Sequence, residues 1–288
     1  MREKRTRKIY LLIILLAIGI TGGILAGPAE AEELMKQNNQ QAEIKPELQE
    51  TVPRLRNEMA TENLRRFKAT VERQALAFPG QFFLEAPQTT GKFVALTFDD
   101  GPDSVFTPQI LKLLAQHKVT ATFFLPGRKI ERFRETARSI KKAGHAVGGH
   151  SYDHPDLRKL TEEVAYNTQV NKTQRIFKNI LGFKPAIFRP PYGAVTDRQI
   201  CFFAETGLKI INWSVDTFDW DRARNSPAQI ASTVLKYGHA GSIILMHSAG
   251  GDRSGTVKAL PVIIKTLRRR GFQFVTVTEL LGLPAELE

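Results

Sequence analysis

The chain has 288 residues, of which 42% are hydrophobic and 24% are charged, a composition that excludes a wholly disordered protein. Its 41 basic and 29 acidic residues give a formal net charge of +12. No basic run with interleaved aromatic residues accompanies this charge, so we expect no nucleic-acid partner. A single cysteine, Cys201, excludes an internal disulfide framework, and packing of the core must supply the stability.

The N-terminal residues predict a segment that enters a membrane. Residues 1–8, MREKRTRK, form a basic flank, and residues 9–26, IYLLIILLAIGITGGILA, carry no charge. This length is at the lower limit for a membrane span and above that of a usual signal-peptide core. We expect an uncleaved anchor with a cytoplasmic basic flank and an extracytoplasmic remainder. A cleaved signal segment ending near Ala31, with a secreted product, is the alternative.

Residues 32–91 are polar, and we interpret them as a stalk between the membrane segment and a folded domain. Apolar residues recur there at helical spacing after Pro53, and they are Leu55, Met59, Leu64, Phe67 and Val71. This spacing predicts an amphipathic helix that packs on the domain or pairs with another chain.

Short apolar runs alternate with helical stretches from residue 92 to residue 285, which we expect to be the folded domain. The predicted strands are 93–98, 120–125, 145–149, 186–190, 209–215, 242–247 and 272–277. The predicted helices are 107–117, 133–143, 160–181, 196–206, 227–237 and 257–270. The alternation indicates an α/β fold with a parallel sheet covered by helices. The near-continuous apolar strands favour a (β/α) barrel of about seven strands over an open sheet.

Two adjacent carboxylates end the first strand of this domain. The stretch ALTFDDGPDS places Asp99 and Asp100 before a Gly-Pro turn, at the strand end where barrel enzymes build their active sites. The turn lets both carboxylates face the same end of the barrel, where they repel each other unless a cation separates their roles. A helix cap would explain only one of the two acids.

Two histidines follow the third predicted strand in the stretch GGHSYDHPDL. His150 and His154 are separated by three residues, and the proline that follows stops a regular helix. With an acid supplied elsewhere they form a zinc-type set of three protein ligands with open positions for water and substrate. With Asp100 they give a site of two histidines and one aspartate. Zinc suits these donors, and cobalt, nickel or manganese would also fit.

Three more polar clusters end later strands. FRPPYGA places Arg189 at a strand end and stiffens the chain before Tyr192, so that the backbone N–H of Tyr192 points in a fixed direction. WSVDTFDW contains Asp216, Asp219 and Trp220, and SIILMHS ends at His247 and Ser248. Clusters at the same ends of successive strands indicate one active site.

Together these stretches resemble the five ordered motifs of the polysaccharide deacetylases, the NodB-homology domain of carbohydrate esterase family 4. The matching stretches are TFDDGP, HSYDHP, RPPYG, DTFDW and ILMHS, and the resemblance covers residues 92–280. It implies a distorted (β/α) barrel and a hydrolase that uses one divalent metal ion to remove acetyl groups from a glycan.

The resemblance also implies a role for each matching residue. Asp99 would be the general base, and Asp100, His150 and His154 the metal ligands. Arg189 would pair with Asp99 and keep it ionised and oriented.

On the leaving-group side, the resemblance makes His247 the general acid. A carboxylate from DTFDW would tune its pKa, and we expect Asp219, with Asp216 as the alternative or a support. The substrate-binding residues would be Pro191, Tyr192, Trp220 and Leu245. Of these, the Tyr192 N–H would stabilise the oxyanion, and Trp220 and Leu245 would enclose the acetyl methyl group.

The expected reaction is metal-dependent N-deacetylation of N-acetylglucosamine residues in a cell-wall glycan outside the membrane. Peptidoglycan is the expected glycan, and a chitin-like oligosaccharide is the other candidate. One alternative is an O-acetyl esterase that acts on xylan-like glycans, because the same site could perform that reaction. Another is an inactive scaffold that binds cell-wall glycan, which the intact set of catalytic groups disfavours.

Overall fold

The computed structural model describes residues 46–86 and 91–287, with side chains from residue 61 onward. The expected basic flank, membrane segment, cleavage site at Ala31 and first part of the stalk lie outside the described residues. Among the helices that are described, none combines the length and the apolar character needed to cross a bilayer. Residues 66–288 form one compact unit.

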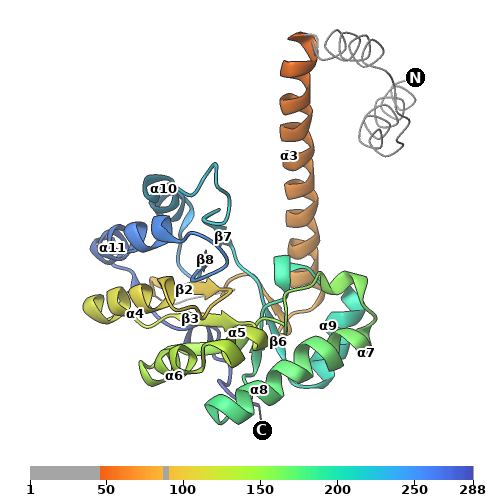
Figure 1. Ribbon diagram of the computed structural model, residues 1–288, viewed down its shortest axis with the longest axis vertical. Helices are drawn as coiled ribbons and strands as arrows, with labels where there is room; N and C mark the ends of the chain where they lie inside the picture. Colours follow the sequence, from red (N-terminus) through yellow and green to blue (C-terminus); the bar gives the residue numbers. More distant parts are fainter. Residues whose placement is uncertain (1–45, 87–90, 288) are drawn as a thin grey trace, which may run out of the picture. The chain divides into compact units, whose positions relative to one another are not determined.

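A parallel sheet forms the centre of this unit (Figure 1). Its strands are β1 (Phe82–Phe83), β2 (Phe93–Asp99), β3 (Thr122–Leu125), β4 (Ala146–Gly149), β5 (Ile187–Phe188), β6 (Lys209–Ile211), β7 (Val215–Asp216), β8 (Ile243–His247) and β9 (Gln273–Phe274). They are ordered β1-β6-β5-β4-β3-β2-β8-β7 in space, and β9 pairs with β2. The order ends at β1 and β7, so the curled sheet is an incomplete barrel. The expected α/β fold with a distorted barrel is confirmed.

Helices precede and flank the strands of this sheet along the chain (Figure 1). They are α3 (Pro46–Ala77), α4 (Phe106–His117), α5 (Gly127–Arg132), α6 (Arg134–Lys142), α7 (Glu162–Val164), α8 (Lys172–Leu181), α9 (Asp197–Glu205), α10 (Pro227–Tyr237), α11 (Ser254–Arg269) and α12 (Val277–Leu281). Short 3₁₀ turns η1 (Leu157–Lys159) and η3 (Pro191–Gly193) and a π-helical segment η2 (Ala165–Asn171) complete the fold.

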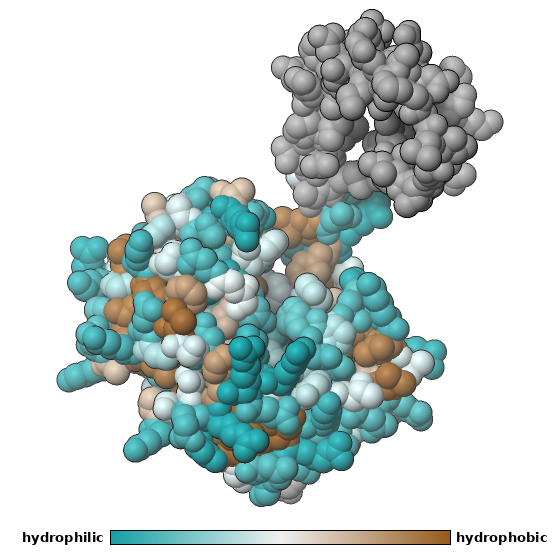
Figure 2. Space-filling model, in the orientation of Figure 1, coloured by the Kyte–Doolittle hydropathy of each residue, from teal (hydrophilic) through white to brown (hydrophobic). Residues whose placement is uncertain are grey.

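Strand β2 is the centre of the fold, and all of its residues except Phe93 are buried. It pairs with β3, β8 and β9, and its aromatic side chain Phe98 stacks on Phe123 of β3 with ring centroids 5.1 Å apart. Burial of one such side chain contributes about 1.5–3 kcal/mol, so this pair contributes to the stability of the core. On the face that Figure 2 shows, apolar side chains lie in separate areas among hydrophilic ones.

The predicted strand over residues 209–215 is two strands, because carbonyl oxygens near its middle form hydrogen bonds with a buried side chain. The carbonyl oxygens of Ile211 and Asn212 accept hydrogen bonds from the guanidinium group of Arg189. The chain then leaves β6, which pairs with β5, and continues in β7, which pairs with β8. The predicted last strand is also shorter than expected, since Thr276 caps α12 through a capping box with Glu279.

The compact unit begins earlier than residue 92, where the sequence places the start of the domain. Strand β1 adds to the edge of the sheet beside β6, although only two residues pair there. Val71 of α3 is also buried, with 6% of its surface exposed. Residues 66–86, which we expected to be stalk, therefore belong to the folded unit.

Candidate active site

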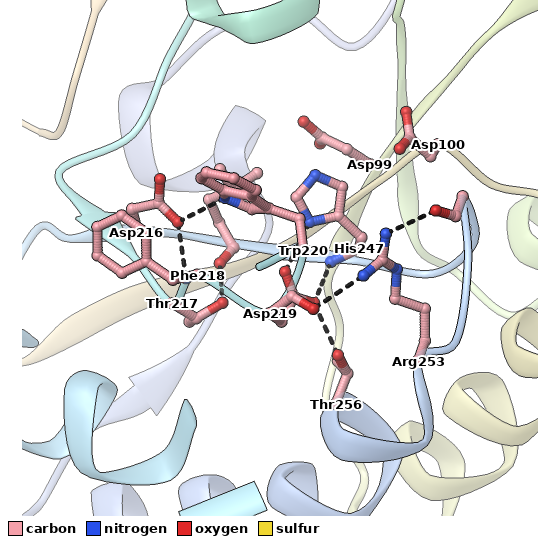
Figure 3. A network of polar contacts seen from close by, with 12 residues as sticks. Asp99, Asp100, Asp216, Thr217, Phe218, Asp219, Trp220, His247, Arg253 and Thr256 are labelled. Atoms are coloured by element: carbon pink, nitrogen blue, oxygen red, sulfur yellow. Dashed lines mark hydrogen bonds and ion pairs between the residues drawn. The ribbon is translucent and has the colours of Figure 1, made fainter. Parts of the chain in front are cut away.

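The register of the parallel strands brings the predicted acid and base together. Asp99 is the last residue of β2 and pairs in register with His247, the last residue of β8. Asp100, the next residue, turns away from the strand with a φ of 66°. Figure 3 shows Asp99 and Asp100 on one side of the His247 ring and Asp219 on the other.

The three predicted metal ligands also come together, although they come from two separate loops. The Oδ1 atom of Asp100 lies 3.6 Å from Nε2 of His150 and 3.4 Å from Nε2 of His154. One ligand atom from each residue lies within 4.8 Å of the others, as binding to a single cation requires.

The environment of His150 fits a metal ligand. Its Nδ1 lies 2.7 Å from the carbonyl oxygen of Arg189, so Nδ1–H donates this bond and leaves the Nε2 lone pair toward Asp100. Burial lowers the pKa of His150 to about 3, and the ring is therefore neutral at neutral pH. A neutral ring with a fixed tautomer beside a carboxylate is a donor set that fits a divalent cation.

Arg189 holds Asp99 in place from inside the barrel. Its guanidinium group is fully buried and lies 2.7 Å from Oδ1 of Asp99. The same group donates to the Thr97 hydroxyl at 2.8 Å and lies over the ring of Phe124 at 4.1 Å. With the two carbonyl contacts described above, these interactions fix the guanidinium group and hence the direction of the Asp99 carboxylate.

Burial and charge act in opposite directions on Asp99. Burial raises the pKa of its carboxyl group above the ordinary value, and the charge and hydrogen bond of Arg189 oppose this rise. A carboxylate with a raised pKa accepts a proton more readily, which is what a general base needs.

On the other side of the site, Asp219 holds His247 through two contacts. Its Oδ1 lies 2.7 Å from Nδ1 of the ring, and its Oδ2 accepts the backbone N–H of His247 at 2.8 Å. Burial alone would lower the pKa of His247, but Asp219, with smaller contributions from Asp100 and Asp99, raises it to about 9. The imidazole is therefore protonated at neutral pH.

Asp216, the alternative partner of His247, faces other groups. It accepts the backbone N–H of Phe218 at 2.8 Å and the indole N–H of Trp220 at 3.3 Å. Burial raises its pKa to about 6. Of the two acids, Asp219 is therefore the one that contacts the ring of His247 (Figure 3).

The predicted substrate-binding residues differ in their exposure. Tyr192 and Trp220 expose 60% and 48% of their surface, so both rings are open to a ligand. Tyr192 also lies edge-on to the ring of His154, one of the predicted metal ligands, with centroids 4.8 Å apart. Pro191 and Leu245 are buried, Pro191 in η3 and Leu245 in β8 two residues before His247.

Sequence reasoning missed two residues of the His247 side. The hydroxyl of Thr256 donates to Oδ2 of Asp219 at 2.7 Å. The buried guanidinium group of Arg253 donates to the carbonyl oxygens of Asp219, Ala249 and Gly250, at 2.8, 2.7 and 2.9 Å. No local pattern singles out either residue, because both reach Asp219 only through the fold.

Comparisons with known proteins agree with this geometry. The family model described as "Polysaccharide deacetylase" matches residues 86–211. A peptidoglycan-N-acetylglucosamine deacetylase of Bacillus cereus is 42% identical over 217 residues, which are 75% of each chain. The chain belongs to the polysaccharide deacetylase family.

Two further relatives extend this result. A peptidoglycan-N-acetylglucosamine deacetylase of Listeria monocytogenes is 41% identical over 199 residues, which cover 69% of this chain and 41% of that protein. The crystal structure of the Bc1960 peptidoglycan N-acetylglucosamine deacetylase superposes with a TM-score of 0.68 at 41% identity, and covers 71% of this chain and 94% of that one. This polysaccharide deacetylase is therefore a hydrolase of carbohydrate esterase family 4 with a possible metal site at Asp100, His150 and His154.

Proposed function

We propose that this deacetylase hydrolyses the N-acetyl groups of N-acetylglucosamine residues in an extracellular cell-wall glycan, most directly peptidoglycan, and releases acetate. The observation that carries the proposal is the in-register pair of Asp99 and His247 beside the three-ligand cluster. Amide hydrolysis needs a base for water and an acid for the amine, and this pair supplies both.

The chemistry assigns one proton transfer to each of these two residues. Asp99 takes a proton from water while the water oxygen bonds to the acetyl carbon. The C–N bond then breaks, and His247 gives its proton to the departing amine nitrogen. A protonated His247 is suited to this step because an amine is a poor leaving group unless it is protonated.

Asp100, His150 and His154 would hold the cation. A divalent ion bound there would polarise the acetyl carbonyl and favour ionisation of water. We propose zinc, because two imidazoles and one carboxylate are its usual ligands in catalytic sites, with cobalt, nickel and manganese as competitors. The backbone N–H of Tyr192 would stabilise the oxyanion as the tetrahedral carbon forms.

The glycan would bind where Tyr192 and Trp220 are exposed. Aromatic rings with one open face are suited to the apolar faces of sugars. All three similar proteins reported above carry names that specify N-acetylglucosamine in peptidoglycan, which supports this substrate for the present chain.

We also propose that residues 9–26 anchor the protein in the membrane. The protein should then stay with membranes after a salt wash. A soluble product beginning near Glu32 would contradict this proposal.

The test is acetate release by the purified full chain, stripped of metal and reloaded with zinc or cobalt. Peptidoglycan, N-acetylglucosamine oligomers and acetylated xylan serve as parallel substrates, and Asp100→Ala is the control. Metal-dependent acetate from either N-acetyl glycan is the expected result. Acetate from xylan alone would replace the proposal with an O-acetyl esterase, and no acetate from any of them with zinc bound would favour a binding scaffold.

A further inference from the structure

The last turns of α3 lie against the loop that carries Tyr192, although the two are more than a hundred residues apart in sequence. We propose that Phe67 and Gln74 of α3 are positioning residues for residues 190–195. In the reaction they would keep the Tyr192 N–H and ring in place. The effect on catalysis rests on the proposed function, whereas the effect on the loop itself does not.

Gln74 holds one end of the loop. Its side chain is buried, with 2% of its surface exposed, and its Nε2 donates to the carbonyl oxygen of Val195 at 3.0 Å. The same amide donates to Oδ1 of Asp197, the first residue of α9, also at 3.0 Å. A buried amide that spans the loop and the next helix limits how far Val195 can move.

Phe67 supports the middle of the loop. Its ring lies 5.9 Å from the ring of Trp213, centroid to centroid. A β-carbon built at Gly193 would lie 2.8 Å from Trp213 Cη2 and 3.0 Å from Phe67 Cζ. The two rings therefore contact the backbone of Gly193 so closely that no side chain fits there.

The loop needs such support because of its backbone conformation. Tyr192 has a φ of 60° and a ψ of 10°, and Gly193 follows with a φ of 65°. A left-handed conformation costs a residue with a side chain about 1 kcal/mol or more, and it persists where the surroundings impose it. Phe67, Trp213 and Gln74 are part of those surroundings.

The side chains around this loop also contact the predicted catalytic and metal-binding residues. The ring of Tyr192 lies against His154, and Trp213 lies 5.7 Å from the guanidinium group of Arg189, which pairs with Asp99. In addition, the side-chain amide of Asn212 donates a hydrogen bond to the Gly193 carbonyl oxygen at 3.0 Å. Phe67 thus contacts the loop directly and is one side chain, Trp213, away from the arginine that holds the predicted base.

A neighbouring contact on the same helix provides a contrast. Arg73 pairs with Asp197 at 2.7 Å, but both side chains are about half exposed, and exposed pairs of this kind contribute little. Leu76 exposes 84% of its surface. Leu76→Ala is therefore the matched control, since it shortens an apolar side chain of α3 that is mostly in solvent.

The experiment compares Phe67→Ala, Gln74→Met and Leu76→Ala with the unaltered full chain. Hydrogen exchange of the amides of residues 192–195 measures the loop, and steady-state kinetics on N-acetylglucosamine oligomers and zinc affinity measure the site. We expect at least about tenfold faster exchange and about tenfold lower kcat for the first two variants, because small displacements of positioned groups cost large factors in rate. Zinc affinity should stay within about twofold, and Leu76→Ala should match the unaltered chain in all three measurements.

Unchanged loop exchange in both variants would overturn the proposal. So would a loss of kcat accompanied by an equal loss of zinc affinity, because that result indicates general damage. If Phe67→Ala does not fold, Phe67→Leu, which keeps part of the contact, replaces it and should give a smaller change in the same direction. If the unaltered chain releases no acetate, the proposed function fails, while loop exchange still decides whether α3 supports the loop.

Discussion

The carboxylate of Asp219 contacts His247 twice, with Oδ1 2.7 Å from the ring Nδ1 and Oδ2 2.8 Å from the backbone N–H. The first contact stabilises the imidazolium form, and the second fixes the carboxylate relative to the strand end that carries the ring. Thr256 and Arg253 hold Asp219 in turn. The protonation of His247 is therefore set by a carboxylate that has little freedom to move.

Asp219→Asn should shift the alkaline limb of the pH profile of kcat/KM to lower pH by more than about one unit. An acid catalyst loses activity as pH rises through its pKa. Burial lowers the pKa of His247, but the charge and hydrogen bond of Asp219, with Asp100 and Asp99, raise it to about 9, so removing the charge of Asp219 lets burial lower it. Asp216→Asn is the control, since Asp216 makes no hydrogen bond to the ring, and it should shift the limb much less. An alkaline limb that stays in place in Asp219→Asn would exclude His247 as the group that titrates there.

Asp99→Asn and Asp100→Ala should separate the base from the metal ligand. Asp99→Asn should keep zinc and lose about 10²–10⁴-fold in kcat, the range for a general base. Asp100→Ala should lose zinc, because Asp100 is the one carboxylate of the three-ligand cluster. Zinc content after dialysis and acetate release measure the two effects, and equal zinc loss in both variants would contradict these roles.

His247→Ala should reduce hydrolysis of an N-acetyl sugar more than hydrolysis of the matching O-acetyl sugar. An alkoxide leaving group needs less protonation than an amine, so the ester depends less on the acid. The comparison of kcat/KM for the two substrates on one variant cancels differences in the amount of active protein. An equal loss on both would argue against a leaving-group acid at this position.

Arg253→Met should lower the free energy of unfolding by about 3 kcal/mol. The change removes the charged donor from the buried carbonyl oxygens of Asp219 and Ala249 and from the part-buried carbonyl oxygen of Gly250. Hydrogen bonds to charged groups contribute roughly 1.5–3 kcal/mol each, so the two buried bonds alone account for at least about 3 kcal/mol. Urea denaturation measures the effect. Arg268→Met is the control, because Arg268 is exposed and donates to a single carbonyl, that of His117.

A similarly small loss in Arg253→Met and Arg268→Met would show that the buried guanidinium group is not a main support of the loop. A second readout follows from Gly250, whose added β-carbon would lie 2.6 Å from Oδ2 of Asp100. A looser Gly250 should therefore also weaken zinc binding in Arg253→Met.

Most of the fold could be predicted from sequence because the central strands are short, apolar and separated by helical stretches. The errors lie where tertiary contacts override local pattern. Residues 209–215 look like one strand, but the carbonyl oxygens of Ile211 and Asn212 bind Arg189 instead of a neighbouring strand. Residues 82–83 were missed as a strand because two paired residues leave no periodic signal.

For the active site, local sequence determined which residues could act: five polar clusters at strand ends, among them an acidic pair and two histidines at ligand spacing. Only the tertiary structure decided which of them meet. It placed His247 beside Asp219 rather than Asp216, and it brought Arg253 and Phe67 to the site from positions that no motif marks. The physical reason is that motifs record chemistry within a few residues of one strand end, whereas contacts between strand ends depend on register and packing across the whole sheet.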